Sequence, residues 1–148
     1  MSEIKARLTD DMKAAMKAGE KDRLGVIRMV LAAVKQREVD ERRELSDSDL
    51  LAVLDKQAKQ RRESLTQYRE AGRDDLADTE AFELSVIESY LPKPLDPDEL
   101  AALIRSAIEE TGASGMQDMG RVMNVVRERA AGRADMGEVS AQVKKQLS

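Results

Sequence analysis

The pattern of apolar positions along the chain is helical from end to end. Apolar residues recur at alternating intervals of three and four, and no segment sustains the period-two alternation typical of a half-buried strand. We therefore expect an all-α protein of seven helices. Four of them, beginning near Ser2, Lys21, Ser46 and Asp74, form the N-terminal part.

Each of the first three helices has its own pattern. The first, about 2–17, places a single apolar face inward: Ile4, Leu8, Met12 and Met16. The second, about 21–43, is apolar on nearly every side in its first half, which predicts a buried central helix, and its polar end, 35–44, should project into solvent. The third, ending at Gly72, carries a seam against a partner helix: Leu51, Leu54, Ala58, Arg61, Leu65 and Tyr68.

All three prolines of the chain lie between Pro92 and Pro97. Proline fixes its own backbone and disfavours helix in the residue before it, so this segment predicts a stiff linker. We expect an N-terminal helical domain over 1–91, a Pro-rich linker over 92–97 and a small C-terminal three-helix domain over 98–148.

Each C-terminal helix begins with a capping pattern, in which a side-chain acceptor is followed three residues later by an acid or amide. The three pairs are Asp96 with Glu99, Ser114 with Gln117, and Asp135 with Glu138. Gly112 and Gly132 should end helices in the left-handed conformation. Gly120 lies inside a helical pattern, where glycine costs about 1 kcal/mol, so we expect close packing or a functional contact there.

Composition narrows the chemistry. The chain of 148 residues contains neither Cys nor His, which excludes disulfides, Cys/His zinc sites, thiol nucleophiles and His-based catalysis. Adjacent acids such as Asp10 and Asp11 point about 100° apart on a helix and do not converge on a metal ion. No phosphate-binding glycine motif is present. We expect no metal, no cofactor and no catalysis by this chain alone.

The sequence shows neither a targeting segment nor a membrane-spanning segment, and this predicts where the protein is located. No charged segment followed by an apolar run opens the chain, and no stretch approaches the length of a membrane span. We therefore expect a cytoplasmic protein with no membrane association.

Two groups of basic residues are candidates for phosphate contacts, although net charge is −4 and aromatic residues make up only 2%. The first is a stripe on the third helix: Lys59, Arg62, Arg69 and Arg73. The second lies near the C-terminus: Arg121, Arg127, Arg133, Lys144 and Lys145. Either group could equally be a solvated face, and Lys144 and Lys145 also suit the end of a helix dipole. Because aromatics are scarce, structured RNA recognised by its backbone is the nucleic acid that fits.

Four segments of the chain resemble the GatB/YqeY family: RMVLAAVKQREVDERRELSD, KQRRESLTQYREAGRDDLA, ESYLPKPL and MQDMGRVMNVVRERAAGRADMGEVSAQVKKQL. The C-terminal part is similar to the tail domain of GatB, a component of the glutamine-dependent tRNA amidotransferase. That likeness rests on Gly120, Val122, Met123, Gly132, Ala134, Val139 and Leu147, with Asp135 where the tail usually carries Asn.

The resemblance implies kinship with a carbon–nitrogen ligase that uses glutamine as amide donor, and transfers no catalytic residue. Three hypotheses follow. The first is a non-catalytic module that binds tRNA. The second is an amidotransferase-type enzyme or subunit that acts on misacylated tRNA with a partner. The third is a helical adaptor that docks a protein through 35–44. The helix-turn-helix pattern around Gly132 needs neither Arg133 nor Lys144, which favours a functional role for both.

Overall fold

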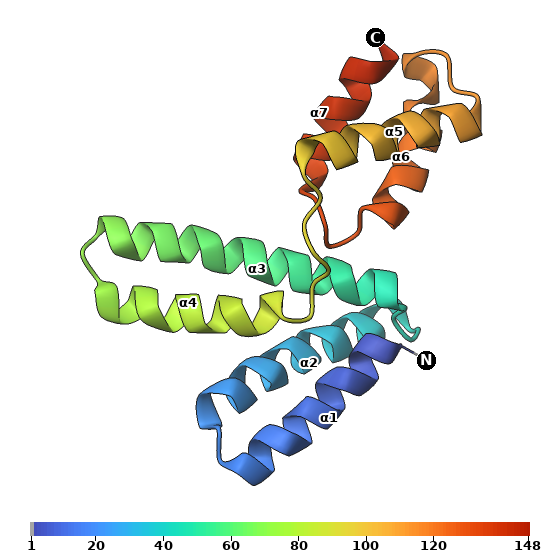
Figure 1. Ribbon diagram of the computed structural model, residues 1–148. Helices are drawn as coiled ribbons and strands as arrows, with labels where there is room; N and C mark the ends of the chain where they lie inside the picture. Colours follow the sequence, from blue (N-terminus) through green and yellow to red (C-terminus); the bar gives the residue numbers. More distant parts are fainter. Residues whose placement is uncertain (1) are drawn as a thin grey trace. The chain divides into compact units, whose positions relative to one another are not determined.

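The computed structural model describes residues 2–148, and every regular element in that range is helical (Figure 1). The chain divides into two compact units, one ending at Leu91 and the other spanning Pro92–Ser148. The first unit contains α1 (Glu3–Ala18), α2 (Lys21–Glu41), α3 (Asp47–Glu70) and α4 (Asp74–Glu88). The second contains α5 (Pro97–Thr111), the 3₁₀ turn η1 (Met116–Asp118), α6 (Met119–Arg129) and α7 (Met136–Leu147). The all-α prediction is confirmed.

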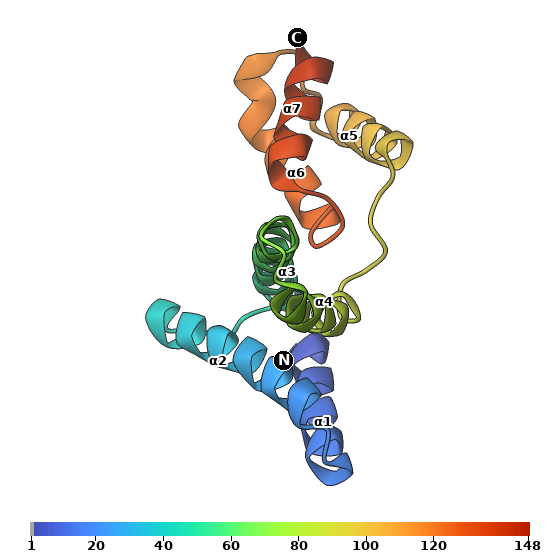
Figure 2. The ribbon, with the colours of Figure 1, turned by 90° about the vertical axis from the view of Figure 1, so that its left-hand side faces the viewer.

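The first unit is built from two helical hairpins. Helix α1 pairs with α2, and α3 pairs with α4; Figure 2 looks along the α3–α4 pair. Helix α2 also contacts α3 and α4, so its buried face joins the two hairpins. The core is almost wholly aliphatic: Leu8, Val26, Ile27, Val30, Val34, Leu45, Leu50, Leu54, Ala58, Val86 and Ile87, with Tyr90.

Two expectations about burial in these helices are wrong. Helix α2 buries one face only, since Met29 on its other side is 39% exposed and Gly25 is open to solvent. Met16, expected on the inner face of α1, is 52% exposed, and Ala15 takes the buried position instead. An aliphatic sequence therefore overstated how much of each helix the neighbours cover.

The polar end of α2 is also held more firmly than expected. Glu38 accepts a bond from Lys5 Nζ at 2.9 Å and one from the backbone N–H of Leu45 at 3.0 Å. Arg43 Nη1 donates to Asp49 at 2.8 Å on the first turn of α3. The bonds from Lys5 and from the Leu45 amide lower the pKa of the Glu38 carboxyl, and the bond from Lys5 has the larger effect. The segment 35–44 thus ties α1, α2 and α3 together, and does not simply project into solvent.

Tyr90 fastens α1 to the end of α4. Its ring is 4% exposed and its hydroxyl donates to the carboxylate of Asp11. The Arg7 guanidinium lies over the ring, 4.7 Å from the centroid, and Arg7 Nη2 donates to the Ser89 carbonyl at 2.9 Å. Burial and the bond to Asp11 raise the pKa of the Tyr90 hydroxyl to about 12.

The second unit packs α5, α6 and α7 around its own core: Leu100, Ile104, Ala107, Val122, Met123, Val126, Ala130, Val139, Val143 and Leu147. The caps expected at the starts of α5 and α7 are present. Asp96 accepts from the Glu99 amide at 2.8 Å, and Asp135 accepts from the Glu138 amide at 3.2 Å. Gly112 and Gly132 have φ values of 67° and 71°, as a left-handed helix stop requires.

The cap expected at Ser114 is wrong. The chain enters α6 through η1, whose N-cap is Gly115, and the carboxylate of Asp118 accepts from the Ser114 amide at 3.0 Å. The carboxylate of Asp118 therefore takes the place that the capping pattern gave to the Gln117 side chain, as acceptor from the Ser114 amide. Gly120 is also not closely packed, because a Cβ placed there would meet no atom within 4 Å.

Candidate nucleic-acid interface

Three of the predicted stripe residues, Lys59, Arg62 and Arg69, lie on α3, whereas Arg73 lies beyond its end, at the N-cap of α4, so its placement on the third helix is wrong. Acids of α4 partly neutralise this basic group. Arg62 lies 3.8 Å from Glu88, and Arg73 lies 3.1 Å from Asp75. Lys59 and Arg69 are exposed as well. Exposed ion pairs of this kind contribute little stability, but they reduce the positive potential that attracts phosphate. The α3 stripe is therefore the weaker of the two candidate faces.

The candidates of the second unit fall into two classes. Arg121 donates to Asp118 at 2.6 Å and to the Thr111 carbonyl at 3.1 Å. Arg133 is half-buried, and its Nε donates to the Lys93 carbonyl at 3.0 Å. Both side chains stabilise turns of this unit. The expectation that Arg133 has no architectural role is thus wrong.

Three candidates are exposed and make no ion pair or side-chain hydrogen bond among residues 2–148: Arg127, Lys144 and Lys145. They are spread along the α6–α7 hairpin. Arg127 lies in the last turn of α6, shortly before the turn into α7, whereas Lys144 and Lys145 lie in the last turn of α7. Lys144 therefore lies about 12 Å along α7 from the first residue of that helix, at its end away from the turn that follows α6, so the three cations suit an extended backbone and not a single phosphate.

One arginine of the first unit, Arg61, is largely buried between α3 and α4. The Arg61 side chain is only 11% exposed, and its Nε lies 3.2 Å from Glu83 on α4. Its Nη1 donates to the Gln57 carbonyl at 3.4 Å, while the neighbouring Glu80 has its pKa raised by burial and by Glu83. The seam pattern located Arg61 correctly, but only its partner on α4 explains why a charge is tolerated there.

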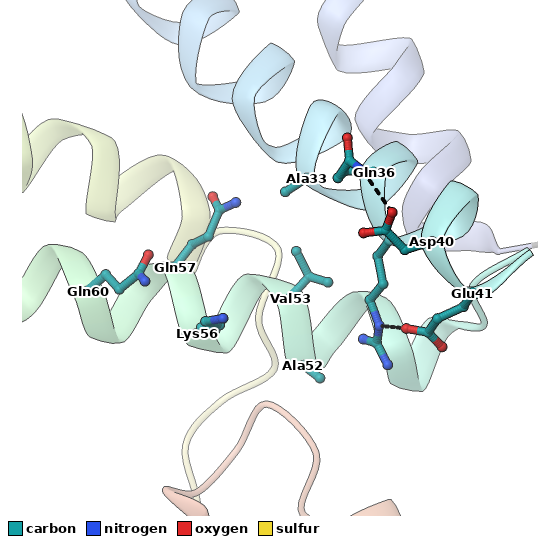
Figure 3. Close-up of a pocket in the computed structure, with 10 residues that line it drawn as sticks. Ala33, Gln36, Asp40, Glu41, Ala52, Val53, Lys56, Gln57 and Gln60 are labelled. Carbon is teal, nitrogen blue, oxygen red and sulfur yellow. Dashed lines mark hydrogen bonds and ion pairs between the residues drawn. The ribbon is translucent and has the colours of Figure 1, made fainter.

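A groove of about 630 Å³ runs between α2 and α3 (Figure 3). Its apolar lining includes Ala33 and Val53, and the groove also carries charged side chains of both signs. The carboxylates present are already bonded: Asp40 accepts from Gln36 at 2.9 Å, and Glu41 accepts from Arg37 at 2.5 Å. Arg37 and Arg43 lower the pKa of Glu41. A lowered pKa keeps the Glu41 carboxyl ionised, which does not suit a general acid, and the two acids and two bases of the lining give no net charge for an ionic ligand.

Two other kinds of site are absent from the described part of the chain. Between residues 2 and 148, the acids form no group of three or more that could hold a metal ion. Within the same range, none of the helices has the length and apolar character needed to cross a bilayer.

The model of the Yqey-like protein family matches residues 5–147. The chain belongs to the YqeY-like family. This membership rests on almost the whole chain, so it covers both helical units. The candidate cations on α3, α6 and α7 all fall inside the matched region.

Curated relatives of this YqeY-like protein are named "Altered inheritance of mitochondria protein 41, mitochondrial". The one from Pyrenophora tritici-repentis is 32% identical over 129 residues, which is 84% of this chain and 71% of the relative. Those from Eremothecium gossypii and Kluyveromyces lactis are 37% and 35% identical over 58% and 57% of this chain. The matched segments make up about half of these two proteins, at 48% and 46%.

Proposed function

We propose that this YqeY-like protein is a non-catalytic accessory module that binds tRNA through the α6–α7 hairpin of its second unit. The supporting observation is the set of three exposed cations without intramolecular partners among residues 2–148, Arg127, Lys144 and Lys145. They lie in the segment that resembles the amidotransferase tail domain. From Leu95 onward the chain has seven basic residues and nine acidic ones. The contact is therefore local, and the remaining surface of the unit repels RNA.

The physical basis is release of counterions from the RNA backbone. A protein that neutralises a few phosphates binds with an affinity that falls as salt rises, with a slope of roughly −0.7 to −0.9 for each phosphate. Three cations predict a slope of roughly −2 to −3 and modest affinity. Base stacking contributes nothing on this hairpin, because α6 and α7 contain no aromatic residue.

The test is fluorescence anisotropy with bulk labelled tRNA over a range of salt concentrations. The triple replacement Arg127→Glu, Lys144→Glu and Lys145→Glu should weaken binding at low salt at least tenfold. The matched control is Arg28→Glu on α2, an exposed arginine of the other unit, which should change the affinity less than twofold. Arg133 is left intact because it holds Lys93. An unchanged Kd in the triple variant would refute the proposal.

A catalytic partnership makes a different prediction. An amidotransferase-type subunit would make glutamine-dependent formation of Asn-tRNA or Gln-tRNA depend on this chain in a reconstituted assay. A binding module alone gives the anisotropy result with no such dependence. The kinship with a carbon–nitrogen ligase motivates the assay, and the absence of Cys and His from this sequence favours the binding module.

The names of the relatives bear on location. They assign those proteins to mitochondria, and we propose that this chain likewise acts with an organellar translation apparatus and not with the cytosolic one. Fractionation of the source cells, followed by immunodetection of the native protein, tests this directly. Recovery only with the cytosolic translation machinery would contradict it.

A further inference from the structure

A stripe of mainly apolar residues runs along the face of α2 that points away from the core. Its members are spaced alternately by four and three residues, and all are exposed: Gly25, Met29, Ala32, Gln36 and Val39. The exposed fraction is 39% for Met29 and 62% for Val39. On a helix, these positions fall within an arc of about 80° and extend over about 21 Å. The α2 stripe therefore has the spacing of a seam between packed helices, although no helix of residues 2–148 covers it.

A row of cations borders the α2 stripe on one side. It recurs at every seventh residue, and all its members are exposed: Lys21, Arg28, Lys35 and Arg42. Successive members of such a row lie about 10.5 Å apart along the helix axis. Within residues 2–148 none of them makes an ion pair or a side-chain hydrogen bond. The nearby Glu38 accepts its hydrogen bonds from Lys5 and the Leu45 amide, which lower its pKa more than Lys35 does. The α2 cation row is thus not neutralised within the described chain.

The opposite side of the α2 stripe carries fewer charges. Asp22 and Asp40 lie there, and Asp40 accepts a hydrogen bond from Gln36 at 2.9 Å. Arg37 lies farther round the helix and donates to Glu41 at 2.5 Å, so this pair adds no net charge. The two sides of the stripe therefore differ in sign, with four cations on one side and two acids on the other.

The α2–α3 groove continues the surface on this second side. Gln36 of the stripe and the neighbouring Ala33 belong to its lining, together with Ala52 and Val53 of α3 (Figure 3). The groove has no net charge and its apolar residues are small, so it can receive an uncharged side chain of a molecule that lies on the stripe.

These features select an amphipathic helix as the occupant. A helix presents its own side chains at the same repeat of seven residues, so it can cover the stripe along its whole length. A nucleic-acid backbone would meet the cations but leave Met29 and Val39 uncovered. An anionic bilayer would repel Asp22 and Asp40. A second copy of α2 carries the same excess of cations beside its stripe, so its charge is not complementary.

We propose that the outward face of α2 docks an amphipathic helix of a partner protein, with apolar side chains on the α2 stripe and acidic side chains along the α2 cation row. The adaptor hypothesis from the sequence placed a protein contact at 35–44, whereas this surface extends over the length of α2. The inference does not rest on the proposed tRNA contact. It uses the other unit and a different class of ligand, so each proposal can fail without the other.

The probes are three fluorescein-labelled helical peptides of equal length. The first has leucines spaced by three and four residues with glutamates beside them. The second has glutamine in place of the leucines, and the third has lysine in place of the glutamates; both changes keep good helix formers. We expect the first peptide to bind at low salt and the second to bind at least about tenfold more weakly. The third should bind about tenfold more weakly at low salt, with a smaller difference at high salt.

Variants of the protein connect these differences to α2. Val39→Gln should reduce the difference between the leucine and glutamine peptides. Val39 is preferred to Met29 for this test, because the sulfur of Met29 accepts a contact from Arg61 Nη2 at 3.1 Å. The double variant Arg28→Gln, Lys35→Gln should reduce the difference between the glutamate and lysine peptides at low salt.

Matched controls separate this surface from general effects. Met116→Gln removes an exposed apolar side chain of the other unit, and Arg69→Gln with Arg105→Gln removes two exposed arginines outside α2. Neither control should alter the binding of any peptide. Circular dichroism melting establishes that each variant is folded. Equal binding of the three peptides, or equal effects of the α2 variants and the controls, would overturn the proposal.

Three further measurements exclude the other occupants. Weaker binding of tRNA, or of vesicles of anionic phospholipid, by Arg28→Gln, Lys35→Gln without any binding of the glutamate peptide would assign the cation row to phosphates and contradict the proposal. A dimer in sedimentation that Val39→Gln dissociates would assign the stripe to a second copy of this chain, and would also contradict it. A monomer that binds the glutamate peptide through Val39 and the cation row supports the proposal.

Discussion

Replacing Tyr90 by phenylalanine removes one hydroxyl and leaves the buried ring in place. The change deletes the hydrogen bond to the Asp11 carboxylate while keeping the ring under the Arg7 guanidinium. A hydrogen bond to an ionised group contributes about 1.5–3 kcal/mol. Asp11 is only half-buried, so water compensates it in the variant, and we expect a loss of about 1–2 kcal/mol, around and below the lower limit of that range.

The assay is unfolding in urea and by heat, followed by circular dichroism. For a unit of this size, that loss corresponds to a fall in Tm of about 4–15 °C, and the urea midpoint should fall with an unchanged slope. Tyr68→Phe is the matched control, because Tyr68 is the other tyrosine and its hydroxyl has no hydrogen bond in the described structure. A double-mutant cycle with Asp11→Ala should return a coupling energy of about 1–2 kcal/mol.

The bond between Tyr90 and Asp11 also determines how the free energy of unfolding changes with pH. The pKa of Tyr90 is raised from 10.0 to about 12 in the folded state, so folding favours the neutral hydroxyl. Its contribution is complete below pH 10 and is lost as pH rises toward 12. Tyr90→Phe should lack this alkaline loss. A variant as stable as the wild-type protein, or a coupling energy near zero, would refute the argument.

Two further predictions concern the free energy of unfolding. Gly25→Ala should stabilise the protein by about 0.5–1 kcal/mol in urea unfolding, since Gly25 lies in the second turn of α2, where a Cβ meets nothing within 4 Å. Gly112→Ala, at φ 67°, should instead destabilise the protein, and the opposite order would contradict both. Asp49→Asn should cost about 1 kcal/mol by weakening the α3 capping box and the bond from Arg43. Arg43 holds the pKa of Asp49 well below its usual range, so the wild-type protein should lose this contribution as pH falls below about 4, and acid titration of Asp49→Asn should show a shallower loss.

Helix positions were readable from the sequence because local signals set them. Gly72 and Gly112, both at positive φ, end helices as glycine's freedom predicts, and Asp96 caps α5 as its spacing from Glu99 indicates. Ser114 shows the limit of such local signals. A serine can cap only if the backbone after it turns directly into the helix, whereas here the chain first forms η1, and Asp118 in place of Gln117 accepts from the Ser114 amide.

Side-chain partners across helices were not readable in this way. Nothing near Arg133 in sequence indicates that its Nε binds Lys93, forty residues away. Likewise, the pairing of Glu38 with Lys5 and of Arg61 with Glu83 depends on which helices become neighbours. A basic residue that seems available for phosphate in the sequence can already be hydrogen-bonded in the folded protein. For this reason some of the predicted site residues are bonded and others are exposed.

Backbone hydrogen bonds hold the chain immediately before the proline segment and within it. Before it, the amides of Tyr90 and Leu91 bond to the carbonyls of Ile87 and Glu88 in α4. Within it, the Leu95 amide bonds to the Arg133 carbonyl at 2.8 Å. The uncommitted backbone is therefore very short, and proline restricts it further. A partner that binds both units would therefore make its second contact as an intramolecular step, for which a short tether gives a high effective concentration.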